Sequence, residues 1–199
     1  LCHAWEQASA PARDLGVRVV HLRIGLVLAP EGGMLGQLVP IFRLCLGGPI
    51  GRGRAWMPWV HWADVVGLID HALRTGQIDG PMNATSPRPV RNAEFSRALG
   101  RALGRPSLLP VPPPALRLAL GELARHAMAS QRVVPRRALA TGYRFAHGEI
   151  DEAMRSVFTP GAGAVDPAEG PQPPSHLDGG PDAVAADASD REPSIAGPP

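Results

Sequence analysis

The sequence has 199 residues, enough to bury a sizeable core in one or two domains, and its formal net charge is +2. All 20 of its Lys or Arg positions are arginine, a bias that base composition explains, so this charge gives little support to nucleic-acid binding. Cys2 and Cys45 are too few and too distant for a disulfide framework or a metal cluster, and no apolar run reaches the ~18 residues of a membrane span. We therefore expect a cytoplasmic protein with reduced, buried thiols.

The first part of the chain predicts a helix followed by a buried strand. Apolar side chains recur at three- and four-residue spacing over residues 1–15, which predicts a helix kinked at Pro11 and ended by Gly16. The β-branched, apolar run over residues 17–28 predicts a strand buried on both faces of a parallel sheet. This is the end of a βαβ crossover whose first strand is not in the sequence. Because the chain starts inside the helix, without Met or a signal segment, we expect the natural protein to begin further upstream.

Short strands and amphipathic helices alternate up to residue 158. Asp64 lies near the start of a helix, where free backbone N–H groups and the helix dipole favour a carboxylate, and Asn92 is placed to cap another helix. The apolar spacing predicts helices over 34–46, 64–74, 93–103, around 116–123, 135–141 and 150–157, and strands over 56–62, 81–85 and 108–111.

The composition changes at Thr159. The segment that follows is rich in Pro, Gly, Ala and Asp, and no aromatic residue occurs after Phe158. Such a segment buries too little apolar surface to offset the entropy lost on ordering, so residues 159–199 are predicted to be a disordered tail.

Several motifs, in a fixed order and spacing, resemble one protein family. They lie at 16–20, 23–28 and 32–33, at 46–51 and 59–65, and at 80–87 and 89–92, with further marks at 109–112, 121–122, 131–135 and 142–145. Together they resemble the YfcH-like epimerase-family proteins, a branch of the extended short-chain dehydrogenase/reductases. The region from about 109 to 157 is similar to the small C-terminal domain of unknown function that closes these proteins.

This resemblance implies an α/β fold, with a doubly wound, Rossmann-like sheet that binds NAD or NADP on its N-terminal half and substrate on its C-terminal half. We expect residues 1–107 to form the substrate side of a partial sheet whose N-terminal half is missing. Residues 108–158 are then a small, mostly helical domain, and residues 159–199 are the tail.

The residues for nucleotide binding and catalysis are absent from the sequence. No Gly-x-Gly-x-x-Gly element opens a strand–helix unit, because Gly51 and Gly53 belong to a loop. The Tyr-x-x-x-Lys of the wider superfamily is also missing, since Tyr143 is the single tyrosine and there is no lysine. We therefore assign no catalytic, cofactor-binding or metal-binding residue, and we expect NAD or NADP not to bind this chain tightly.

Four residues are candidates for the wall of a substrate pocket: Arg23, Trp59, His61 and Asn83. Arg23 interrupts an apolar strand, where its charge needs either a ligand or an ion-pair partner. His61 lies in a Trp-rich segment and contacts a ligand or is a satisfied core histidine; no third ligand at suitable spacing supports a metal. Asn83 reaches a ligand or bonds the backbone at a turn.

The remaining arginines have a simpler explanation. We expect solvated side chains for the arginines at 52, 54 and 91 and for the cluster at 132, 136 and 137. The alternative for the first three is contact with a charged substrate, and the alternative for the cluster is contact with nucleic acid.

We expect a fragment, inactive alone, of an NAD(P)-dependent oxidoreductase or nucleotide-sugar-epimerase-like protein that acts on a small molecule. The alternative is a non-catalytic NAD(P)-binding sensor or regulatory module; an upstream Tyr and Lys favour the enzyme, and their replacement favours the sensor. An arginine-rich nucleic-acid binder would need aromatic and basic residues interleaved on one sheet face, which the sequence does not show. We expect neither nucleic acid nor a membrane as partner.

Overall fold

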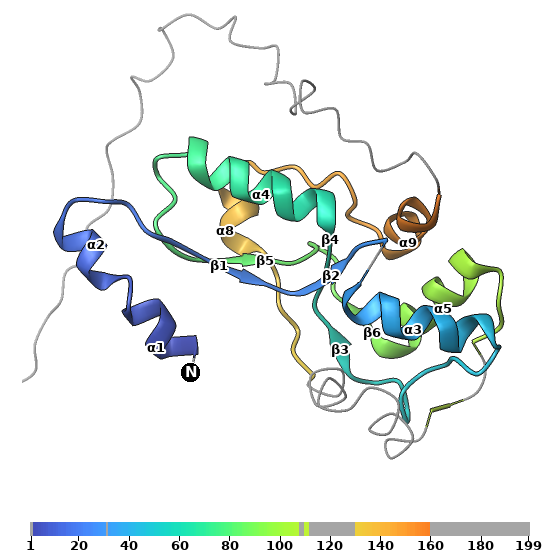
Figure 1. Ribbon diagram of the computed structural model, residues 1–199. Helices are drawn as coiled ribbons and strands as arrows, with labels where there is room; N and C mark the ends of the chain where they lie inside the picture. The colour runs from blue at the N-terminus through green and yellow to red at the C-terminus, as the bar shows by residue number, and fades with distance from the viewer. Residues whose placement is uncertain (1, 31, 108–109, 112–129, 160–199) are drawn as a thin grey trace, which may run out of the picture. The chain divides into compact units, whose positions relative to one another are not determined.

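The computed structural model describes residues 2–30, 32–107, 110–111 and 130–159. Helices and short strands alternate along this part of the chain, which confirms the predicted α/β class (Figure 1). The elements are α1 (Cys2–Gln7), α2 (Ala10–Asp14), β1 (Val20–Ile24), β2 (Leu26–Leu28), α3 (Gly33–Arg43), β3 (Trp56–Met57), β4 (Trp59–His61), α4 (Trp62–Arg74), β5 (Gly80–Ala84), β6 (Val90–Arg91), α5 (Asn92–Leu103), α8 (Arg136–Ala140) and α9 (Ile150–Phe158).

Some predictions fall wholly or mainly outside the described residues. These are the strand over 108–111, the helix around 116–123 and the disorder of the tail beyond residue 159. No helix in the described part of the chain combines the length and the apolar character needed to cross a membrane.

The strand predicted over residues 17–28 is two strands, because the chain changes its pairing partner at Gly25. β1 pairs in parallel with β5, with Val20 opposite Gly80, and β2 pairs in parallel with β4. The Gly25 N–H donates to the Ala84 carbonyl at 3.0 Å, and the Leu26 N–H donates to the Pro58 carbonyl at 2.7 Å. A Cβ at Gly25 would lie 2.4 Å from that carbonyl oxygen, so only glycine allows this close approach.

The expectation that this strand is buried on both faces is wrong. Val17 lies before β1 and is exposed, and the side chain of Ile24 is 51% exposed. Within the described residues β1 has a hydrogen-bonded neighbour, β5, on one side only. The strand therefore keeps an uncovered edge, while Leu28 at the end of β2 is fully buried.

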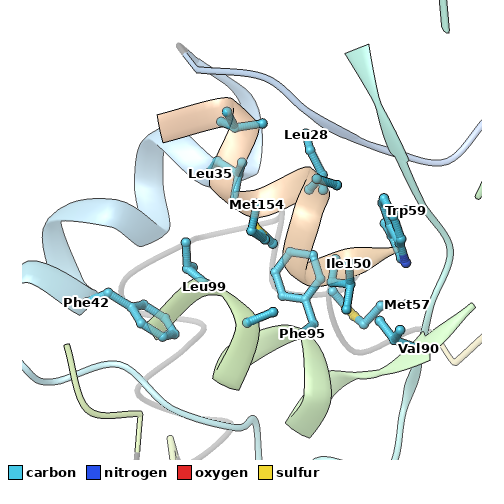
Figure 2. Close-up of a cluster of buried hydrophobic side chains, with 13 residues drawn as sticks. Leu28, Leu35, Phe42, Met57, Trp59, Val90, Phe95, Leu99, Ile150 and Met154 are labelled. Atoms are coloured by element: carbon cyan, nitrogen blue, oxygen red, sulfur yellow. The ribbon is translucent and has the colours of Figure 1, made fainter. Parts of the chain in front are cut away.

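Two hydrophobic clusters form the interior of the described part of the chain. The larger joins β2, α3, α5 and α9 through Leu28, Leu35, Phe95 and Met154, whose side chains converge in Figure 2. The smaller lies where α4 and α8 meet β5 and is formed by Leu68, Ala72, Ile78, Met82, Ala84 and Ala138. Residues 136–158 contribute to both clusters, so the C-terminal part of the described chain packs against the rest. The boundary placed at residue 107 stays a prediction.

Three local predictions are corrected. Pro11 lies in the first turn of a separate helix, α2, instead of kinking a continuous one, because proline is favoured in a first helical turn. Asn92 was expected to cap α5, but the residue before this helix is Arg91. The Asn92 side chain instead accepts a hydrogen bond from the Ile50 N–H at 2.7 Å. Cys45, expected to be buried, is exposed; it lies in the turn that follows α3 and has a positive φ of 61°.

Candidate functional site: an arginine-lined cleft

A cleft of about 540 Å³ opens beside the paired strands β1 and β5. Its walls come from β1, β5, the segment before α8 and α8 itself. The residues that line it are Arg23, Pro81, Asn83, Arg132, Val133, Val134, Arg136 and Arg137. In open parallel sheets, ligands bind beyond the carboxyl ends of the strands. Arg23 and Asn83 are the next-to-last residues of β1 and β5, so the cleft reaches this edge.

The parallel register brings two of the four predicted pocket residues together. Arg23 is the cross-strand partner of Asn83. The Arg23 guanidinium also donates to both carboxylate oxygens of Glu6, each at 2.7 Å. The ion-pair explanation of Arg23 therefore holds, and the same side chain lines the cleft.

Asn83 and Arg137 attach the opposite wall to the sheet. The Asn83 Nδ2 donates to the Val134 carbonyl at 3.3 Å, which is the backbone-bonding role considered for this residue. Arg137 donates to the backbone carbonyls of Pro81, at 3.1 Å, and Asp79. These bonds fix the start of α8 against β5.

The cleft carries an excess of positive charge. Among the described residues that line it, four are arginines and none carries a carboxylate. Glu6 offsets the charge of Arg23. The other three guanidiniums come from the cluster expected to be solvated, and their side chains are indeed exposed. Arginine presents a fork of N–H donors that matches phosphate or carboxylate, so the arrangement suits an anionic ligand.

Trp59 and His61 lie in the interior and do not line this cleft. Trp59 is fully buried in the larger cluster and donates its indole N–H to the Arg88 carbonyl at 3.2 Å. Their contact with a ligand stays a prediction. The arginines at 52, 54 and 91 also lie outside the lining.

His61 has the bonding of a satisfied core histidine. Its Nδ1 accepts from the Ala63 N–H at 3.2 Å at the start of α4, and its Nε2 lies 3.1 Å from the Ser156 Oγ. Since Nδ1 accepts, Nε2 carries the proton and donates to Ser156, whose hydroxyl donates to the Ala153 carbonyl at 2.9 Å. Burial, and the charge of nearby His147, lower the pKa of His61 to about 4. His61 is thus neutral at physiological pH and oriented as a donor.

The structure shows a buried polar network that sequence reasoning missed. Asp64 accepts from the backbone N–H groups of Ala146 and His147, at 2.8 and 3.0 Å, and from the Tyr143 hydroxyl at 3.2 Å. Burial, then the neighbouring carboxylate and this hydrogen bond, raise the pKa of Tyr143 above its ordinary value. The hydroxyl therefore stays protonated and acts as a structural donor. The sequence marked Asp64 as a helix-start carboxylate and Tyr143 as part of a family motif, but nothing in it indicated that the two side chains meet.

Comparisons with known proteins agree with the resemblance seen in the sequence. The family described as Domain of unknown function (DUF1731) matches residues 111–157. An epimerase family protein of Mycobacterium bovis is 43% identical over 160 residues, which cover 80% of this chain and 53% of that protein. The epimerase family protein SDR39U1 of Mus musculus is 43% identical over 154 residues, or 77% of this chain and 52% of that protein. The chain thus spans about half the length of these curated relatives.

Solved structures give the same result. The human epimerase family protein SDR39U1, solved with NADPH, is 38% identical with a TM-score of 0.67, and the match covers 71% of this chain and 48% of that one. A nucleoside-diphosphate sugar epimerase of Corynebacterium glutamicum is 33% identical with a TM-score of 0.62, over 79% of this chain and 30% of that one. A UDP-glucose 4-epimerase of Thermus thermophilus, solved with NAD, is 23% identical over 80% of this chain and 51% of that one, and its TM-score of 0.56 shows the shared Rossmann-type fold. The chain therefore resembles, in sequence and in fold, the C-terminal portion of a larger epimerase-family protein.

Proposed function

We propose that this chain is the substrate-side portion of an NAD(P)-dependent oxidoreductase or nucleotide-sugar-epimerase-like protein, inactive alone, and that its substrate is an anionic small molecule. The observation that carries this proposal is the cleft that reaches the carboxyl edge of β1 and β5, whose described lining holds four arginines and one amide but no carboxylate. A diphosphate group suits this cleft, because its phosphate oxygens accept hydrogen bonds from guanidinium N–H groups. The Corynebacterium glutamicum relative, a nucleoside-diphosphate sugar epimerase, supports this class of substrate.

The described residues do not fit the dinucleotide itself. Pyrophosphate needs a glycine turn that leaves the backbone open at a helix N-terminus. The turn at Gly51 and Gly53 is closed by packing, since a Cβ on Gly53 would lie 2.6 Å from the Cβ of Ala93. We therefore assign substrate binding and orientation to this chain, and no step of hydride transfer to its described residues.

A hybrid protein tests this proposal. The chain is joined to the N-terminal half of the Mycobacterium bovis relative, and NADPH binding is followed by nicotinamide fluorescence. UDP-glucose is then added, and its sugar configuration and redox state are followed by proton NMR and by absorbance of the reduced nicotinamide. We expect NADPH binding, and UDP-glucose binding that weakens when Arg136 is replaced by Ala. A folded hybrid that binds NADPH and no sugar nucleotide contradicts the proposed substrate class, and binding of both without chemistry favours the sensor.

A further inference from the structure

One cleft arginine lies over an aromatic ring that is outside the cleft. The Cζ atom of Arg132 is 5.4 Å from the centroid of the Trp56 ring, and the Cζ atom of Arg91 is 4.4 Å from the same centroid. Arg132 lines the cleft, whereas Arg91 and Trp56 do not. Trp56 thus contacts one guanidinium that lines the cleft and one that does not.

The position of Trp56 is fixed by the fold. Trp56 and Met57 form β3, which pairs with β6 in antiparallel fashion, with Trp56 opposite Arg91. Successive side chains of a strand point to opposite faces. Met57 is accordingly buried in the larger hydrophobic cluster, and Trp56 stays half-buried on the other face. The core therefore uses Met57 and leaves the indole available to the arginines.

The backbone that carries Arg132 is held on both sides of it. The Trp56 N–H donates to the Ser130 Oγ at 3.1 Å, and Asn83 donates to the Val134 carbonyl at 3.3 Å. Between these two points the Arg132 side chain is exposed, and a long exposed side chain has many rotamers to lose when it binds a ligand. A contact with the face of an indole removes part of this freedom before binding.

We propose that Trp56 is a positioning residue of the cleft: its ring holds the Arg132 guanidinium so that it binds the diphosphate group of the ligand. This inference rests on the proposed anionic substrate. Arg132 supplies the donors, and Trp56 acts through Arg132 without touching the ligand. A ring at position 56 is then required, and apolar bulk at that position is not sufficient.

The test uses the full chain and inorganic pyrophosphate, titrated by calorimetry at low ionic strength. We expect R132A to weaken binding about tenfold, and W56L to weaken it about two- to fivefold because the ring is lost. W56F keeps a ring and should bind within about twofold of the unchanged chain, by the same reasoning. The matched control is R91A, which removes the other guanidinium over the same ring and should leave the affinity unchanged. The double variant W56L/R132A should bind no more weakly than R132A.

The possible failures are distinguishable. If the unchanged chain does not bind pyrophosphate, the anionic substrate of the proposed function is wrong. If it binds and R132A weakens binding, but W56L does not, the cleft stands and the role of Trp56 is overturned. Equal weakening by W56L and W56F would mean that the native indole matters only for packing, and it too overturns the inference. Thermal unfolding of each variant shows that it is folded.

Discussion

The Asp64 carboxylate, at the start of α4, accepts hydrogen bonds from the backbone N–H groups of Ala146 and His147, far along the chain. The first turn of a helix favours a carboxylate, and sequence reasoning expected Asp64 to serve its own helix. It instead holds the segment that leads into α9. Because α9 packs into the larger hydrophobic cluster, this one side chain couples α4 to the C-terminal part of the core.

We expect Asp64→Ala to lower the free energy of unfolding by roughly 3 kcal/mol or more, since buried donors lose a charged acceptor. Chemical denaturation measures the change. Asp70→Ala is the matched control: Asp70 lies on the same helix and forms an exposed ion pair with Arg74, so its loss should change little. Equal effects of the two substitutions would contradict the structural role of Asp64.

Stability should fall as pH falls through the range set by His61. Its pKa is lowered from 6.5 to about 4 in the folded chain, so below pH 6.5 the unfolded chain takes up a proton that the folded chain refuses. The part of the unfolding free energy that depends on neutral His61 is fully present above pH 6.5. It is lost progressively as the pH falls towards 4. Between pH 7.5 and 4.5 this amounts to roughly 2–3 kcal/mol.

The variant His61→Asn isolates this effect. Asparagine keeps an acceptor for the Ala63 N–H at the helix start but does not titrate. Unfolding free energies at both pH values should therefore differ less in the variant than in the unchanged chain. An identical pH dependence in the two proteins would show that His61 is not the group responsible.

The chain alone should not bind NAD or NADP tightly. The reason is the absence of a Gly-x-Gly-x-x-Gly element in the sequence and the packed turn at Gly53. Isothermal titration with each dinucleotide measures this directly. Micromolar affinity for either one would contradict the prediction, whereas weak binding that R132A abolishes would reflect the positively charged cleft.

The outer face of α4 should make the isolated chain prone to self-association. Val66, Ile69 and Leu73 follow helical spacing and are 55%, 45% and 71% exposed. Ile69 and Leu73 also line a mainly apolar groove of about 220 Å³ beside β1, a strand whose edge is uncovered within the described residues. Contiguous exposed apolar surface and a free strand edge both promote association.

The double variant Ile69→Gln/Leu73→Gln should be more monomeric by light scattering at an unchanged melting temperature. Leu68→Gln on the same helix is the contrasting control, because Leu68 is fully buried and its replacement should destabilise the fold. A double variant that associates as strongly as the unchanged chain would show that α4 is not the surface involved.

Local patterns in the sequence were enough to place most helices and strands. Apolar spacing placed α3, α4, α5 and α9 to within a few residues, because a helix that packs one face on a core must repeat apolar residues at its own period. The order of the motifs was enough for the family resemblance. Arg23 and Asn83 stood out because a charge or an amide in an apolar strand requires a partner.

Relationships between distant segments required the tertiary structure. The partner change at Gly25 depends on how closely the Pro58 carbonyl approaches, and the exposure of Ile24 depends on which strand edges are covered. The cleft brings together arginines that are far apart in the described chain, because β1 pairs with β5 and α8 packs beside them. Asp64 likewise accepts hydrogen bonds from backbone N–H groups in the segment before α9. Sequence periodicity reports which face of an element is apolar; which atoms meet across the fold is decided by strand register and packing, which depend on residues far apart in the chain.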